Sequence, residues 1–159
     1  MDAESSKPPR LWVDMVAELP QLKSRPFLVE DSELVARLVA ELGFRVIQVH
    51  LPLGIENAEE AVLVQLTAEL GFSDLGAGSW AAFEDRLWDL LTAEGEPPVA
   101  IFLEGLDRLP SSDLHGFVRI VHNLLSMTEG VGLADSSADL QVEYFFVGTW
   151  SARDVRASK

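Results

Sequence analysis

The chain has 159 residues, a formal net charge of −14 and no cysteine. The lack of cysteine excludes disulfides and thiolate metal sites, and the negative charge disfavours binding to nucleic acid or to an anionic membrane. Hydrophobic residues make up 48% of the chain, enough for the core of one domain. The same charge attracts basic partners at long range, although a general role in solubility would account for it equally.

The two ends differ from the rest of the chain. Residues 1–10 are polar, contain no apolar signal-peptide segment, and are expected to be disordered. Residues 11–43 are expected to form an N-terminal extension, residues 44–150 the main domain and residues 151–159 a C-terminal tail. No apolar run reaches the roughly 18 residues of a membrane span. These features predict a cytoplasmic, monomeric protein.

The extension contains one strand–helix unit. Residues 11–22 carry a short apolar run that no pattern assigns to a helix or strand. Residues 26–29 have strand character. A helix is expected over residues 32–42, because Asp31 or Ser32 can cap its N-terminus.

A second strand and two helices follow. Residues 44–51 are rich in β-branched residues, which is typical of a strand. Apolar residues at helical spacing predict a helix over residues 57–70. A glycine-rich loop at residues 71–78 then leads into a helix over residues 79–92, for which Ser79 is the expected N-cap.

The helix over residues 79–92 has two contrasting sides. At about 100° per residue its apolar side chains form one stripe. They are Phe83, Leu87, Leu90 and Leu91, with Trp80 on the edge. Asp85 and Asp89 point the opposite way, beside small alanines. The pattern predicts a buried apolar side and an acidic outer side that could dock a partner; the alternative is a core helix with two solvated aspartates.

The last third of the chain completes the fold. Residues 99–103 are apolar on both faces, which is typical of a central strand of a parallel sheet. A helix capped by Ser111 or Ser112 is expected to extend to residue 127, and residues 142–147 form the last strand. Strands that alternate with helices predict an α/β layer fold with a largely parallel sheet.

No constellation of residues indicates an enzyme, a cofactor or a metal site. His50, His115 and His122 lack metal-ligand spacing, and His50 is expected to be a satisfied residue at the core edge. Glu104 and Asp107 follow a strand, where catalytic carboxylates often lie, but no cation is placed beside them. We therefore expect a non-catalytic protein.

The order of strands also imitates a P-loop NTPase. Glu104 would then stand in the Walker B position and Thr149 near the sensor position. The loop after the first strand, residues 30–33, reads Glu-Asp-Ser-Glu and lacks the GxxxxGK[ST] motif. In this alternative the chain is a degenerate P-loop NTPase-like domain that acts as a non-catalytic adapter.

The stretch around residues 71–92 resembles the barstar family, small cytoplasmic inhibitors of bacterial ribonucleases. Many members carry a signature resembling GFPxYFGxNWDALxDxLxDL. This chain matches it without gaps at Gly71, Phe72, Trp80, Ala82, Asp85, Leu87, Asp89 and Leu90. The resemblance covers about residues 44–147. It implies a barstar-like layer of parallel strands packed against helices over residues 44–150, preceded by the strand–helix extension.

The resemblance also implies a function. The protein would be an inhibitor or immunity protein, an antitoxin that blocks the active site of a basic ribonuclease or related toxin with an acidic helix. The implied partner-binding residues are Gly76, Gly78, Ser79, Trp80, Ala81, Glu84, Asp85, Trp88, Asp89 and Asn123. Asp85 falls on the family's principal acidic contact, whereas a rival register assigns that role to Asp89.

This chain departs from the family pattern at the contact surface. The usual Asn is Ser79, the first Asp is Ala81, and the aromatic–Gly pair is Gly76-Ala77. These changes imply a different or weaker partner than the type enzyme. Strand order is expected to separate the alternatives, because barstar-like strands are sequentially adjacent whereas a P-loop sheet inserts a later strand between the first two.

Overall fold

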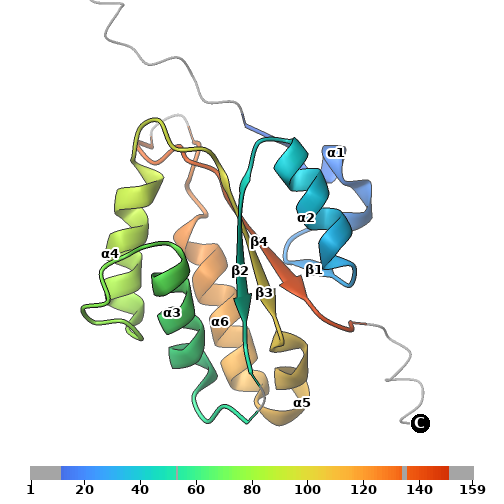
Figure 1. Ribbon diagram of the computed structural model, residues 1–159, viewed down its shortest axis with the longest axis vertical. Helices are drawn as coiled ribbons and strands as arrows, with labels where there is room; N and C mark the ends of the chain where they lie inside the picture. The colour runs from blue at the N-terminus through green and yellow to red at the C-terminus, as the bar shows by residue number, and fades with distance from the viewer. Residues whose placement is uncertain (1–11, 53, 134–135, 151–159) are drawn as a thin grey trace, which may run out of the picture.

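The computed structural model describes residues 12–52, 54–133 and 136–150. The predicted disordered N-terminus and the C-terminal tail lie outside these residues. The described chain forms one four-stranded parallel sheet with helices on both faces (Figure 1). The predicted α/β fold, with parallel strands packed against helices and a strand–helix unit at the N-terminal side, is confirmed.

The four predicted strands are all present. Their bounds are β1 Phe27–Val29, β2 Arg45–His50, β3 Val99–Glu104 and β4 Val142–Val147. The order across the sheet is β1-β4-β3-β2. Strand β3 is central, as its apolar character predicted, and β4 is likewise paired on both sides.

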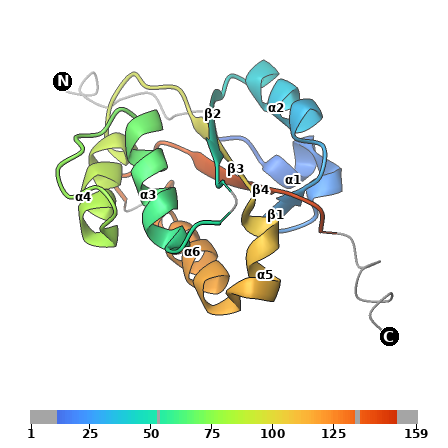
Figure 2. The same cartoon turned by 60° about the horizontal axis from the view of Figure 1, so that its bottom comes forward.

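The helices divide between the two faces of the sheet. Their bounds are α1 Met15–Glu18, η2 Pro20–Leu22, α2 Ser32–Glu41, α3 Ala58–Glu69, α4 Trp80–Leu91, η3 Leu106–Arg108, α5 Leu109–Ser112 and α6 Leu114–Met127. Helices α1 and α2 cover one face, and α3, α4 and α6 cover the other (Figure 2). The chain crosses the sheet in one direction from β1 to β2 and returns through β3 to β4. Right-handed crossovers therefore place the outward and return helices on opposite faces.

Two parts of the chain differ from the sequence-based expectation. The predicted helix that ends at Met127 is present as α6, but the predicted cap at Ser111 or Ser112 is wrong, because α6 begins only at Leu114, after a break that follows α5. The hydroxyls of both serines donate to the Arg108 carbonyl, at 3.3 and 3.1 Å, and so belong to the end of α5. Asp113 caps α6 instead, since its Oδ1 accepts from the Gly116 amide at 3.0 Å. The unassigned residues 11–22 contain α1 and η2.

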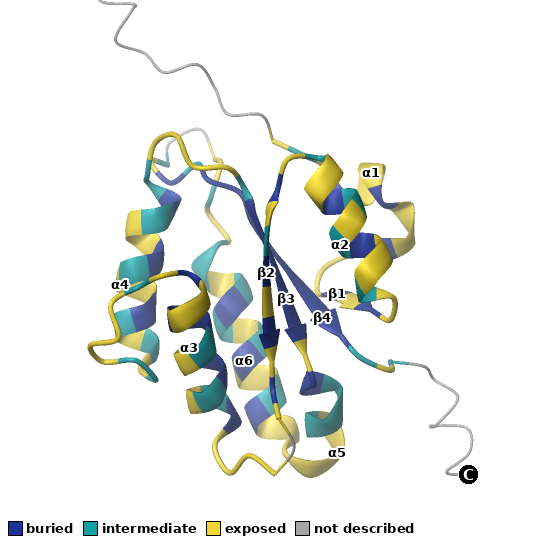
Figure 3. Cartoon of the chain, viewed as in Figure 1, coloured by how far each residue is buried: buried dark blue, intermediate teal, exposed yellow. Residues whose placement is uncertain are grey.

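Strand β4 is buried along its whole length (Figure 3), and its side chains alternate between two apolar cores, one on each side of the sheet. Val142, Tyr144 and Phe146 face the larger core under α3, α4 and α6. Phe145 and Val147 face the smaller core under α1 and α2. Burial, assisted by the adjacent Glu143 carboxylate, raises the pKa of the Tyr144 phenol.

A buried polar cluster joins the N-terminal segment to the start of β4. The Glu143 side chain is 3% exposed, and its Oε2 lies 2.6 Å from Nη2 of Arg25. Gln141 Nε2 donates to the same carboxylate at 2.8 Å. The Gln141 amide also bonds the backbone N–H and C=O of Val13, at 2.9 and 2.8 Å. Glu143 is thus fully engaged although it lies in a core.

The strand order does not decide between the two alternatives raised by the sequence. Strands β2, β3 and β4 lie side by side in sequence order, as expected for a barstar-like domain over residues 44–150. Counted from β1, two later strands lie between the first two, as expected for a P-loop sheet. Both descriptions fit because β1 is added next to β4, at the end of the series.

Candidate partner-binding surface

The loop before α4 is shaped by glycine. Gly76 and Gly78 have φ of +76° and +97°, in the left-handed region that favours glycine. A Cβ at Gly78 would lie 3.1 Å from Cγ of Glu60, so the loop passes close to α3. Ser79 is the N-cap, as predicted, because its Oγ accepts from the Ala82 amide at 3.3 Å. The loop therefore fixes where α4 begins.

Helix α4 has the two predicted sides. Phe83, Leu87 and Leu91 are each 1% exposed, whereas Leu90 is only half-buried. Asp85 and Asp89 are exposed on the outer side, and neither carboxylate pairs with another described residue. We call these two residues the acidic ridge. The helix lies on the side of the molecule opposite α1 and α2, so the sheet does not cover the ridge (Figure 1).

A groove of about 410 Å³ separates α4 from α6 on one flank of the ridge. We call it the α4–α6 groove. It is lined by Trp80, Ala81 and Glu84 of α4 and by Arg119, Asn123, Ser126 and Met127 of α6. The structure thereby brings Asn123 together with three predicted residues that lie about 40 positions earlier in the chain. Gly76, Gly78 and Ser79 lie at the N-terminal end of α4 and are not part of the groove lining.

The α4–α6 groove is held by a network that local sequence patterns did not reveal. Glu59 of α3 accepts a hydrogen bond from Trp80 Nε1 at 2.9 Å and from Arg119 Nε at 3.1 Å. One carboxylate therefore links α3, α4 and α6. Because the indole N–H of Trp80 already donates to Glu59, Trp80 can contact a partner by packing of its ring but not by donating a hydrogen bond.

Trp88 is the large aromatic residue next to the acidic ridge. Its side chain is 51% exposed, although tryptophan is usually well buried. Exposed tryptophans surrounded by polar residues are typical of the energetic centres of protein interfaces. Trp88, Asp85 and Asp89 are all exposed on the part of α4 that faces away from its core stripe.

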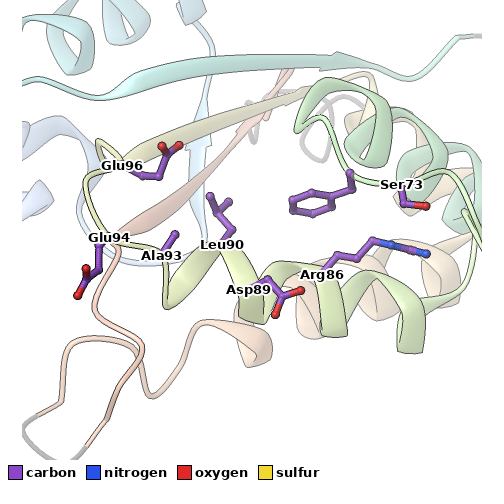
Figure 4. Close-up of a pocket in the computed structure, with 8 residues that line it drawn as sticks. Ser73, Arg86, Asp89, Leu90, Ala93, Glu94 and Glu96 are labelled. Carbon is purple, nitrogen blue, oxygen red and sulfur yellow. The ribbon is translucent and has the colours of Figure 1, made fainter.

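The opposite flank of the ridge carries a shallow hollow (Figure 4). Asp89 is the only predicted site residue in its lining. Sequence reasoning missed the contribution of Phe72 and Arg86. Arg86 Nη2 donates to the Leu75 carbonyl, which ties α4 to the preceding loop.

The carboxyl ends of β2 and β3 carry two of the residues considered for an alternative site, His50 and Glu104. His50 ends β2 and has a partner, as predicted, because its Nδ1 lies 2.9 Å from Oε1 of Glu104, but its side chain is 65% exposed and so lies outside the core. A hollow of about 230 Å³ adjoins the pair. In the described part of the chain no three His, Asp or Glu side chains converge as a metal site would require.

The turn between β1 and α2 lacks the features of a phosphate loop. Only Glu30 and Asp31 separate the strand from the helix. Asp31 Oδ1 accepts from the Leu34 amide at 3.1 Å, so a carboxylate already occupies the helix N-terminus where a phosphate would bind. Thr149, the residue near the sensor position, donates its backbone N–H to Asp107 Oδ2 at 2.9 Å.

Comparisons of the chain with protein-family models, with curated proteins and with solved structures found no match. None of the helices in residues 12–52, 54–133 and 136–150 has both the length and the apolar character needed to cross a bilayer.

Proposed function

We propose that the chain is a non-catalytic inhibitor or immunity protein that binds a basic protein, a small ribonuclease or related toxin, through α4. The observation that supports this most is the acidic ridge. Asp85 and Asp89 are exposed, unpaired among the described residues, and adjacent to an exposed tryptophan. The net charge of −14 makes the whole molecule attractive to a positively charged partner.

The mechanism needs no chemistry on this chain. A ribonuclease active site holds phosphate with cationic side chains. The acidic ridge would occupy that site and exclude RNA, while Trp88 and the α4–α6 groove enlarge the buried contact. Long-range attraction accelerates the encounter, and charge pairs buried in the complex slow dissociation. Because a desolvated aspartate without a partner is costly, the affinity depends on the cations of the enzyme.

The test measures inhibition of RNA cleavage by a panel of small basic bacterial ribonucleases, barnase among them, at increasing concentrations of this protein. Inhibition of at least one enzyme is expected, with Asp85→Ala weakening it at least tenfold. Glu33→Ala removes the same charge from α2 on the opposite face and should have little effect. The proposal fails if no enzyme is inhibited, or if the two variants behave alike.

A second candidate is favoured by the position of β1. Because β4 and β3 lie between β1 and β2, a degenerate P-loop-like adapter also accounts for the sheet. Such an adapter would dock a partner without blocking its active site. Binding of a basic protein that leaves its enzymatic activity intact would favour the adapter, whereas loss of that activity would favour the inhibitor. Tight, magnesium-dependent binding of ATP would contradict both.

A further inference from the structure

At the carboxyl edge of the sheet, the chain that follows two neighbouring strands packs against opposite faces. After β1 the chain enters α2, which packs against the smaller core. After β4 it reaches Trp150, whose ring lies 5.9 Å from the ring of Phe117 of α6 and packs against the larger core. Strands β1 and β4 are paired neighbours. In parallel α/β sheets, a crevice for ligands opens at this kind of divergence, outside the carboxyl ends of the strands.

A hollow of about 230 Å³ lies at this edge. It is lined by Ser32, Gln48, Val49, His50, Phe102, Glu104 and Val147. We call it the strand-end hollow. It brings the first residue of α2 together with the ends of β2, β3 and β4. Its volume is below the roughly 300 Å³ of the smallest pockets that hold drug-sized molecules, so its ligand must be small.

Three oxygen acceptors in this hollow have no partner among the described residues. Glu104 Oε1 lies 2.9 Å from Nδ1 of His50, which leaves Oε2 of the same carboxylate without a partner. Ser32 Oγ and Gln48 Oε1 likewise make no hydrogen bond within the described part of the chain. The three oxygens come from α2, β2 and β3. Beside them lie the apolar side chains of Phe102 and Val147, which belong to the smaller core.

We propose that the strand-end hollow binds the ammonium group of a small aliphatic amine. An ammonium group carries three donors and no acceptor, which matches three oxygens on three separate elements. Its bond to Glu104 is charge-assisted and is therefore the strongest of the three. The alkyl part of the ligand would lie against Phe102 and Val147. No residue of the acidic ridge lines this hollow, so the proposal does not rest on the function proposed above.

Other ligand classes fit these groups less well. An anion would meet the Glu104 carboxylate, and a neutral alcohol would form no charge-assisted bond with it. A guanidinium pairs best with both oxygens of one carboxylate, but His50 already occupies Oε1 of Glu104. A metal ion would find no three converging His, Asp or Glu side chains in the described part of the chain. The net charge of −14 also favours a cation over a neutral ligand.

The experiment records ¹⁵N–¹H spectra of the full chain at neutral pH and constant ionic strength, with n-butylamine as the probe. Saturable shifts of the Ser32, Gln48 and His50 amide signals are expected. The comparison ligand is n-butanol, which has the same carbon chain and no charge. It should bind at least fivefold more weakly, because it forms no charge-assisted bond.

Two variants of the hollow and one matched control complete the experiment. Glu104→Gln keeps the shape of the side chain and removes its charge, so it should weaken n-butylamine binding at least fivefold. Gln48→Leu removes one oxygen acceptor and should weaken binding at least twofold. Glu33→Gln removes the same charge from the residue after Ser32, outside the lining, and should change binding less than twofold.

Three results would overturn the amine site. The first is the absence of saturable shifts at these amides up to about 100 mM n-butylamine, far above a millimolar dissociation constant. The second is equal binding of n-butanol. The third is an equal loss in Glu104→Gln and Glu33→Gln, which would reduce the effect to the general attraction of an acidic protein for cations. None of these results bears on ribonuclease inhibition, which the Asp85→Ala comparison tests on the other side of the molecule.

Discussion

Carboxylates serve opposite purposes at the start of β4 and on α4. Glu143 is buried and has Arg25 and Gln141 as partners, so its charge is satisfied inside the protein. Asp85 and Asp89 are exposed and have no partner among the described residues. Buried and paired, a carboxylate specifies how segments join; exposed and unpaired, it remains available to another molecule. Removing each kind should therefore have different consequences.

A large loss of stability is expected when the ion pair between the half-exposed Arg25 and the buried Glu143 is broken. Arg25→Met leaves the Glu143 carboxylate buried without its cation, which should lower the free energy of unfolding by about 3 kcal/mol. The double variant Arg25→Met/Glu143→Leu should recover most of that loss, because no unpaired charge then remains. Urea denaturation of the two proteins gives both numbers. An Arg25→Met variant as stable as the parent would show that the cluster does not stabilise the packing of the N-terminal segment against β4.

A substitution on the apolar side of α4 should lower stability by a similar amount. Leu87 is 1% exposed, so Leu87→Ala should cost about 2 to 5 kcal/mol through lost burial and the cavity that remains. Asp85→Ala, half a turn away, should change stability by less than about 0.5 kcal/mol. Thermal or urea unfolding of the matched pair checks this contrast. Similar losses in both variants would mean that Asp85 is structural.

Tyr144 lies on the other side of β4 from Glu143, and it should make the stability of the protein depend on pH in the alkaline range. Its pKa is raised in the folded state by burial and then by Glu143, so the unfolded chain loses the phenolic proton first. The contribution of this group to the free energy of unfolding is fully present below the pKa of the unfolded chain, about 10. Above that pH the free energy of unfolding falls by up to about 1.4 kcal/mol per pH unit.

The matched variant for this test is Tyr144→Phe. It should remove that alkaline component of the pH dependence. Near neutral pH it should cost little, because the hydroxyl has no hydrogen-bond partner among the described residues. Urea unfolding from pH 7 to 11 compares the two proteins, and an unchanged alkaline slope would contradict the assignment.

Local patterns predicted the elements well because their determinants are local. The caps Asp31, Asn57 and Ser79 each accept a bond from an amide three residues later, a relation visible in the sequence. The cap of α6 was mistaken because Ser111 and Ser112 use their hydroxyls on the preceding turn.

Long-range partners explain what the sequence could not predict. Glu143 looks like an ordinary strand residue until Arg25, 118 residues away, is placed against it. The partner of His50 could not be predicted for the same reason, since Glu104 follows it by 54 residues. The acidic ridge could be predicted from helical spacing alone. The α4–α6 groove and the shallow hollow on the opposite flank of the ridge depend on which segments pack beside α4, and helical spacing carries no information about that.

The most direct measurement is the inhibition constant of the protein and its Asp85→Ala and Glu33→Ala variants against whichever small basic ribonuclease the parent inhibits. The account predicts a loss of at least tenfold for Asp85→Ala, with the stability of the parent retained, and a change of less than twofold for Glu33→Ala. Equal inhibition by the parent and Asp85→Ala would contradict the claim that the acidic ridge binds the partner.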